Sequence, residues 1–230
     1  MEIRGQVFMI NLFLSGGGDE EQTDIIDKEF VKALDLDKPL LYIPIAMQGE
    51  IPYEVCYKWI HSVFNPLGIN VIEMWTDLEA KSLEDLKKFS SIYIGGGNTF
   101  NLLNTLRETG FDKILKEFVD NKGIVYGGSA GAIIFGRDIL TSSHMDPNHT
   151  NLKTFKGFNY LDNYSVWCHY ETSNDSLIKE YVNKYGVSVL ALPEEAGIVI
   201  NGGTLKVIGS SPAYIFRNGD KYVVESNGEK

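Results

Sequence analysis

The stretch GIVYGGSAGAIIFG, residues 123–136, joins a short apolar run to a cluster of small residues. The run 124–126 is typical of a buried strand, and apolar residues follow the cluster at helical spacing. Between them, Gly127-x-Ser129-x-Gly131 has the pattern of a nucleophile elbow, a strand-to-helix turn too tight for larger residues beside the serine. The pattern predicts Ser129 as a nucleophile. In the alternative interpretation, the serine is only the N-cap of the helix.

Short apolar runs alternate with amphipathic helical patterns along most of the 230 residues. The expected strands are 7–14, 40–45, 69–75, 91–94, 124–126, 166–168 and 187–192. The expected helices are 20–34, 53–64, 82–89, 99–107, 111–119 and 176–185. This order predicts one α/β domain over residues 1–230, with a mostly parallel sheet flanked by helices. Gly202-Gly203 and Asn218-Gly219-Asp220 predict hairpin turns, so antiparallel strands should end the fold.

The composition argues against several classes of function. The formal net charge is −10 and the sequence pI is about 4.9, which argues against binding nucleic acid or an anionic membrane through clustered basic residues. No apolar run reaches the roughly 18 residues that a membrane helix needs. Cys56 and Cys168 lie far apart and show neither a disulfide framework nor zinc spacing, so we expect a cytoplasmic protein without a metal site.

A second glycine cluster, 95–97, follows the apolar run 91–94 and precedes Asn98 and an expected helix. Such a loop could cradle a phosphate, but no lysine follows the glycines as in a P-loop, and the spacing is not Gly-x-Gly-x-x-Gly. A part in an oxyanion hole is therefore the better interpretation of this glycine loop. There, a backbone N–H of this loop would join the N–H of Ala130, the residue after the serine.

A serine nucleophile needs a base, and four histidines are available. His61 lies in an amphipathic helical pattern. His144 and His149 lie in the polar segment 137–163, which we expect to be a loop and call the polar loop. His169 ends the apolar run 165–168, so it should stand at a strand terminus, where a positioned base belongs. For His61 a surface or satisfied position is the usual case, His144 and His149 stay plausible but have no anchor, and a structural role is the alternative for His169.

An acidic residue should orient the base. Glu194 and Glu195 follow another apolar run and Pro193, and either carboxylate could accept the second imidazole N–H. Because neighbouring residues of an extended segment point in opposite directions, only one of the two should reach His169, and we choose Glu194. In the alternative interpretation, the pair belongs to a solvated loop.

Together these motifs resemble the peptidase family of the aspartyl dipeptidases, which includes dipeptidase E and relatives such as the cyanophycinases. The resemblance spans most of the chain and rests on Gly95-Gly-Gly-Asn-Thr-Phe-x-Leu-Leu103, Gly128-Ser-Ala-Gly-Ala132, the strand ending in His169, and Leu192-Pro-Glu194. It implies a fold like that of class I glutamine amidotransferases and no metal or organic cofactor. The implied site is Ser129 as nucleophile, His169 as base, Glu194 as orienting acid, and the N–H groups of Gly97 and Ala130 as oxyanion hole. We also expect Asn98 to bind substrate.

One position departs from the family's pattern. In dipeptidase E an arginine downstream of the histidine reads the N-terminal aspartate of the substrate, whereas residues 169–177 here contain no arginine. They contain Glu171 and Asp175, which should repel an acidic substrate side chain if they lie near the pocket. Arg137, Lys153 or Lys156 could still reach the site from the polar loop.

The sequence therefore predicts a cytoplasmic serine-type peptidase, a monomer or homodimer, that cleaves small peptides or related amides and binds neither nucleic acid nor membrane. Two alternatives stay open. One is a hydrolase of a different acyl or isopeptide substrate, and the other is a non-catalytic binding or regulatory protein that keeps the fold.

Overall fold

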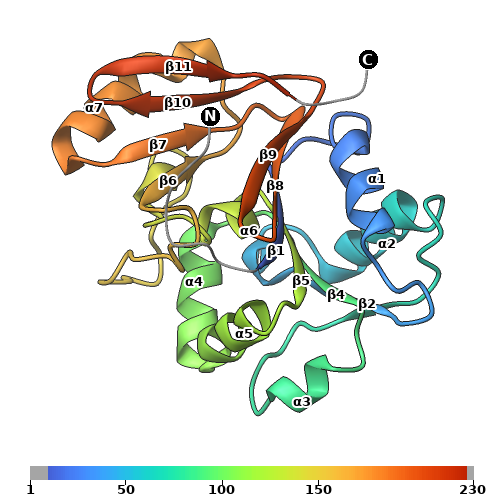
Figure 1. Cartoon of the computed structure of the whole chain (residues 1–230). Helices are drawn as coiled ribbons and strands as arrows, with labels where there is room; N and C mark the ends of the chain where they lie inside the picture. The colour runs from blue at the N-terminus through green and yellow to red at the C-terminus, as the bar shows by residue number, and fades with distance from the viewer. Residues whose placement is uncertain (1–9, 227–230) are drawn as a thin grey trace.

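The structure, a computed structural model, describes residues 10–226 and contains two β-sheets with helices packed around them (Figure 1). The larger sheet has the strand order β3-β2-β4-β5-β1-β8-β9. Its strands are β1 (Asn11–Ser15), β2 (Leu40–Ile43), β3 (Ile72–Met74), β4 (Ser91–Ile94), β5 (Ile124–Gly128), β8 (Ala196–Asn201) and β9 (Thr204–Gly209). Neighbours from β3 to β1 pair in parallel, whereas β8 is antiparallel to β1 and β9. The predicted mostly parallel sheet is confirmed; residues 7–9 of its first expected strand lie outside the described residues.

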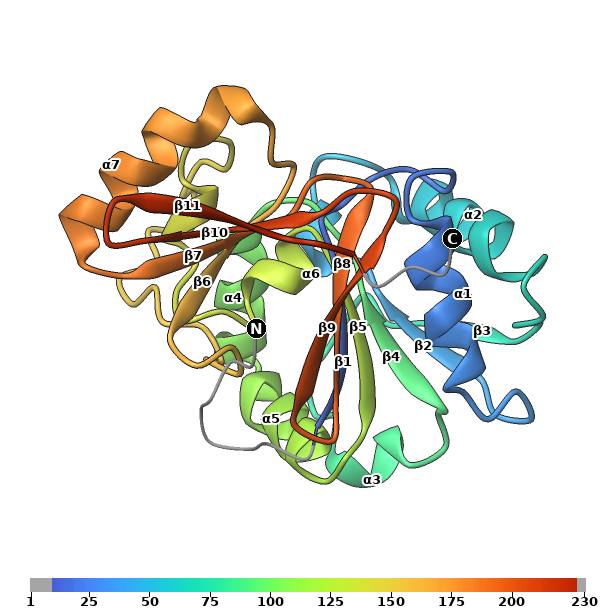
Figure 2. The ribbon, with the colours of Figure 1, turned by 45° about the horizontal axis from the view of Figure 1, so that its top comes forward.

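Helices cover both faces of this sheet, because successive side chains of each buried strand point to opposite faces. On one face, an aromatic layer packs against α1 (Asp24–Lys32) and α2 (Tyr53–Phe64). That layer contains Phe13, Tyr42, Tyr93 and Tyr126. The other face is aliphatic and packs against α4 (Thr99–Glu108), α5 (Phe111–Asp120) and the single-turn helix α6 (Ala130–Ile133), with the short α3 (Leu83–Leu86) beside α5. Figure 2 shows the two helical layers on either side of the strands.

A second sheet has the order β11-β10-β7-β6 and was not foreseen as separate from the first. Its strands are β6 (Tyr164–Trp167), β7 (Ser188–Ala191), β10 (Ala213–Arg217) and β11 (Asp220–Val224). Strands β6 and β7 are parallel, and α7 (Asp175–Tyr185) connects them and packs on the sheet through Ile178, Tyr181 and Val182. The runs expected at 166–168 and 187–192 are therefore strands, but of this smaller sheet.

Several helices and strands have the expected bounds, and others begin or end at different residues. Helix α2 and strand β4 have their expected bounds, and Gly202-Gly203 and Asn218-Gly219 turn between antiparallel strands. Helix α1 begins at Asp24 rather than at residue 20, because Asp19 accepts hydrogen bonds from the backbone N–H groups of Glu21 and Gln22 and holds that segment in a turn.

The fold brings three loops to one edge of the larger sheet, the carboxyl ends of β1, β4 and β5. The chain after β6 reaches the same edge from the second sheet, because the N–H of His169 donates to the carbonyl of Gly16 at 2.9 Å. In α/β proteins such edges are where sites gather.

Candidate active site

Ser129 stands at a sharp turn between β5 and α6, with backbone angles φ 51° and ψ −110°. The turn requires small neighbours. A Cβ on Gly127 would lie 2.3 Å from the carbonyl oxygen of Gly131, and a Cβ on Gly131 would lie 2.3 Å from that of Ile94. The Ser129 side chain makes no capping bond to α6, so the N-cap interpretation does not describe it. Helix α6 is one turn long, so local N–H groups rather than a helix dipole are available to an anion.

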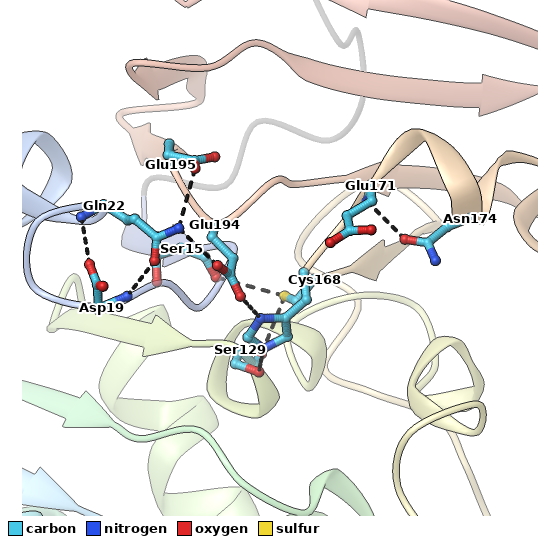
Figure 3. Close-up of polar contacts among 10 residues, drawn as sticks. Ser15, Asp19, Gln22, Ser129, Cys168, Glu171, Asn174, Glu194 and Glu195 are labelled. Carbon is cyan, nitrogen blue, oxygen red and sulfur yellow. Dashed lines mark hydrogen bonds and ion pairs between the residues drawn. The ribbon is translucent and has the colours of Figure 1, made fainter.

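Ser129, His169 and Glu194 form a hydrogen-bonded chain. Figure 3 labels Ser129 and Glu194, which lie on either side of an unlabelled imidazole ring. Ser129 Oγ lies 2.8 Å from His169 Nε2, and His169 Nδ1 lies 2.8 Å from Glu194 Oε1. A carboxylate can only accept, so Nδ1 carries the proton of the neutral imidazole, and Nε2 is left to accept from the serine hydroxyl. His169 also adopts a positive φ of 50°, a conformation unusual for a non-glycine residue. Strained backbone at two neighbouring polar side chains is a feature of functional sites.

The hydrogen bond from His169 lowers the pKa of the Glu194 carboxyl, which therefore stays ionised beside the imidazole. Glu194 and Glu195 lie in a turn rather than in an extended segment, and both accept from the amide of Gln22, at 2.8 and 3.2 Å. The two side chains therefore do not point in opposite directions. Of the two, only Glu194 bonds His169, as far as the described residues show.

Two parts of the site were missed from the sequence. Gly17 has a φ of +99°, and a Cβ there would lie 2.7 Å from both His169 Cε1 and Ser129 Cβ, so the loop after β1 packs directly on the serine and histidine. The glycine run 16–18 after a strand next to β5 could have indicated this. Gln22, which bridges the two glutamates, carries no such signal.

The two expected oxyanion donors belong to residues near Ser129, since Ala130 follows it in the chain and Gly97 lines both cavities beside it. A Cβ on Gly96 would be 3.7 Å from Ser129 Oγ, so the backbone of the second glycine cluster approaches the hydroxyl closely. Within residues 10–226, the N–H groups of Gly97 and Ala130 donate to no protein acceptor. Two free donors near a hydroxyl are what a developing oxyanion requires.

Asn98 does not face either cavity beside Ser129. Its side-chain oxygen accepts from the N–H of Asn101 at 3.0 Å, and its side-chain nitrogen donates to the carbonyl of Pro147 at 2.9 Å. Next to it, Asp146 accepts from the N–H of Thr99 at 2.9 Å. Asn98 therefore anchors the polar loop on the start of α4, and substrate binding by its side chain stays a prediction.

Among the described histidines, only His169 hydrogen-bonds the serine hydroxyl, although His144 lines a cavity beside it. His144 stacks on Trp167 at 4.2 Å and contacts the carbonyl of Thr141, and burial lowers its pKa. His61 pairs with Asn65 on α2, and His149 lines neither cavity beside Ser129.

Cys168 precedes His169 but is no rival nucleophile. Its side chain is 3% exposed, its Sγ lies 3.5 Å from the carbonyl oxygen of Ser129, and burial raises the pKa of the thiol. Within the described residues, no three His, Cys, Asp or Glu side chains come together in a way that could hold a metal ion. No described helix is long and apolar enough to cross a membrane.

Two cavities meet at the serine, and Gly97, Ser129 and His169 line both. The first, which we call the aromatic cavity, has a volume of about 350 Å³. It is also lined by Tyr42, Met47, Ile51, Val55, Trp59 and Tyr93. The second, the acidic cavity, has a volume of about 200 Å³ and is lined by Glu50, Thr99, His144 and Asp146 among others. No lysine or arginine of the described chain lines either cavity.

Comparison with known proteins gives one consistent result. The sequence model of peptidase family S51 matches residues 12–208. The chain is 28% identical over 188 residues to "Probable alpha-aspartyl dipeptidase" of Drosophila melanogaster, which covers 78% of this chain and 76% of that protein. It is 27% identical over 196 residues to "Peptidase E" of Shewanella denitrificans, over 82% of each. The crystal structure of a peptidase from an acI-B1 actinobacterium has the same fold, with a TM-score of 0.73, 20% identity and 97% of each chain covered.

Proposed function

The chain belongs to peptidase family S51 and is a serine-type peptidase, and we propose that Ser129, His169 and Glu194 form its catalytic triad. With this triad the enzyme hydrolyses short peptides through an acyl-enzyme. The observation that carries the proposal is the chain of two 2.8 Å hydrogen bonds from a serine at a nucleophile elbow to an ionised carboxylate.

In the first half of the reaction, Ser129 Oγ attacks the carbonyl carbon of the peptide while His169 Nε2 takes the hydroxyl proton. The imidazole becomes charged, and the ionised Glu194 stabilises it without taking the proton itself. The carbonyl oxygen becomes an oxyanion, which the N–H groups of Gly97 and Ala130 bind. Within the described residues, neither N–H donates to a protein acceptor, so both are available to the oxyanion.

In the second half, His169 gives its proton to the departing amine, and the carbon–nitrogen bond breaks to leave an ester on Ser129. A water molecule then attacks the ester while His169 Nε2 takes its proton. The bond between Oγ and the acyl carbon breaks, His169 returns the proton to Ser129 Oγ, and the carboxylic acid product leaves. The short distance between Gly17 and both side chains keeps the imidazole over the serine during these transfers.

The size of the site supports a short substrate. The aromatic cavity, at about 350 Å³, lies at the lower end of the range for ligand pockets. The polar loop closes the other side, where Asp146 and Asn98 anchor it to α4. A small peptide fits these limits better than a folded protein chain does.

The test is covalent labelling with a fluorophosphonate, which reacts only with an activated serine. We expect one label per chain, located on Ser129 by peptide mapping, and no label in Ser129→Ala. Ser173→Ala, which alters an exposed serine outside both cavities, should label as the wild type does. Absence of labelling in the folded wild type would favour a non-catalytic protein with this fold.

A further inference from the structure

The aromatic cavity suggests what the substrate carries next to its scissile bond. Building on the proposed function, we propose that this cavity binds a bulky apolar side chain of the peptide, and that the enzyme does not select an acidic residue there.

The floor of the cavity consists of aromatic rings from the larger sheet and from α2. Tyr42 and Tyr93 contact each other edge to face with ring centroids 5.7 Å apart, and Trp59 lies 6.1 Å from Tyr93 in the same arrangement. Tyr93 in turn stacks on the buried Tyr126 at 4.5 Å, which fixes the floor from below. The rings therefore present a preformed apolar surface that needs no rearrangement to receive a side chain.

The mouth of the cavity is apolar as well. Ile51 and Val55 line it, yet they are 41% and 51% exposed to solvent. An apolar group entering the cavity would remove these side chains from water together with its own surface, which is favourable. The cavity is continuous with the site, because Ser129 and His169 form its inner wall. The occupant is therefore a group of the molecule being cleaved.

The charges around the serine do not suit an acidic side chain. A carboxylate in the aromatic cavity would lose its hydration without a cation to compensate, since no described lysine or arginine lines either cavity. Among the described residues, the acids that line the acidic cavity are Glu50 and Asp146, and they would add repulsion from the adjoining space.

The acids expected from the sequence to provide that repulsion lie elsewhere. Asp175 accepts from Tyr170 and pairs with Lys221 at 3.1 Å, and Glu171 caps a short turn near Asn174, away from the serine in Figure 3. Neither residue lines a cavity beside Ser129. The expectation that Glu171 and Asp175 repel an acidic substrate side chain at the site is therefore wrong. Arg137, Lys153 and Lys156 also stay outside both cavities.

The first experiment measures kcat/KM for alanine dipeptides in which one position is changed in turn to Leu, Phe, Asp or Lys. At one of the two positions we expect Leu and Phe to exceed Ala by about tenfold or more, and Asp and Lys to fall below Ala. Preference for Asp or Lys over Leu at both positions, or no preference at all, would overturn the proposal. A preference for Lys would indicate that the rings bind a cation instead.

The second experiment changes the rim of the cavity. Val55→Arg places a cation beside the bound side chain, so the ratio of kcat/KM for Asp to that for Leu should rise at least tenfold at the selective position. Val71→Arg is the matched control, since Val71 is 59% exposed and lines neither cavity. Equal ratios in the two variants would contradict the placement of the substrate in this cavity.

A third measurement separates this inference from the proposed function. Calorimetric binding of the same dipeptides to Ser129→Ala does not need catalysis, and the Leu and Phe peptides should bind about tenfold more tightly than the Asp peptide. If the wild type is labelled and active but shows no such preference, the triad is supported and the cavity assignment is rejected. If the apolar peptides bind more tightly but the wild type is not labelled, the cavity assignment is supported and the triad is rejected.

Discussion

His169 and Glu194 lie on loops that follow strands of the second sheet, and their side chains meet at 2.8 Å beside an elbow that belongs to the first sheet. The candidate active site thus lies where the two sheets adjoin. The serine, the glycine loops and the proposed oxyanion donors come from the parallel strands, while the proposed base and its acid come from the smaller sheet. Packing between the sheets therefore controls the distance from base to nucleophile.

The first prediction concerns which glutamate orients the base. Glu194→Gln should lower kcat by about 10² to 10⁴-fold, because an amide cannot stabilise the imidazolium and can hold the wrong tautomer. Glu195→Gln is the matched control, and its kcat should stay within about threefold of the wild type, since Glu195 bonds Gln22 and Ser211 instead of His169. Steady-state kinetics on a neutral dipeptide provides the comparison, and a larger loss in the Glu195 variant would reverse the assignment.

The second prediction concerns the loop after β1. Gly17→Ala should reduce kcat by more than about tenfold, because the added Cβ would lie 2.7 Å from the imidazole and displace it from the serine. Gly219→Ala requires a similar positive φ, +88° against +99°, but no atom lies within 4 Å of its Cβ. The control should lose about 1 kcal/mol of stability and keep its kcat. Equal kcat in both variants would mean that the loop does not position His169.

The third prediction concerns Asp27, whose side chain on α1 is only 2% exposed. Burial raises its pKa from 3.8 to about 6, so the folded protein binds more protons than the unfolded chain between these values. Its contribution to the free energy of unfolding is therefore largest below pH 4 and is lost as the pH rises through 6.

Asp27→Asn should remove this dependence. The free energy of unfolding of the variant minus that of the wild type should increase by about 2 kcal/mol from pH 4 to pH 8. Urea unfolding at both pH values measures the change. Asp24→Asn, on the same helix and exposed, is the control and should change far less. A difference between wild type and Asp27→Asn that does not vary with pH would show that Asp27 titrates normally in the folded state.

Each of the proposed catalytic residues has a local signal in the sequence. Gly127 is required by a contact within the turn, because its Cβ would meet the carbonyl oxygen of Gly131, whereas Gly131 is required by the carbonyl oxygen of Ile94 on the neighbouring strand β4. His169 and Glu194 each follow an apolar run. Contacts between distant segments carry no such signal. Gly17 and Gln22 matter only because β1 pairs with β5 and α1 starts near the turn after β7. For the same reason, the sequence could not show that Tyr42, Trp59 and Tyr93 share one cavity, or that Asp175 turns away toward Lys221.

The central claim, that Ser129 and His169 act as one catalytic unit, is tested most directly by kcat/KM of Ser129→Ala, His169→Ala and the double variant on one dipeptide. Each single variant should lose at least about 10³-fold while remaining folded, and the double variant should be little worse than either, because removing one partner already disables the other. Near wild-type activity in Ser129→Ala, or losses that multiply in the double variant, would contradict the account.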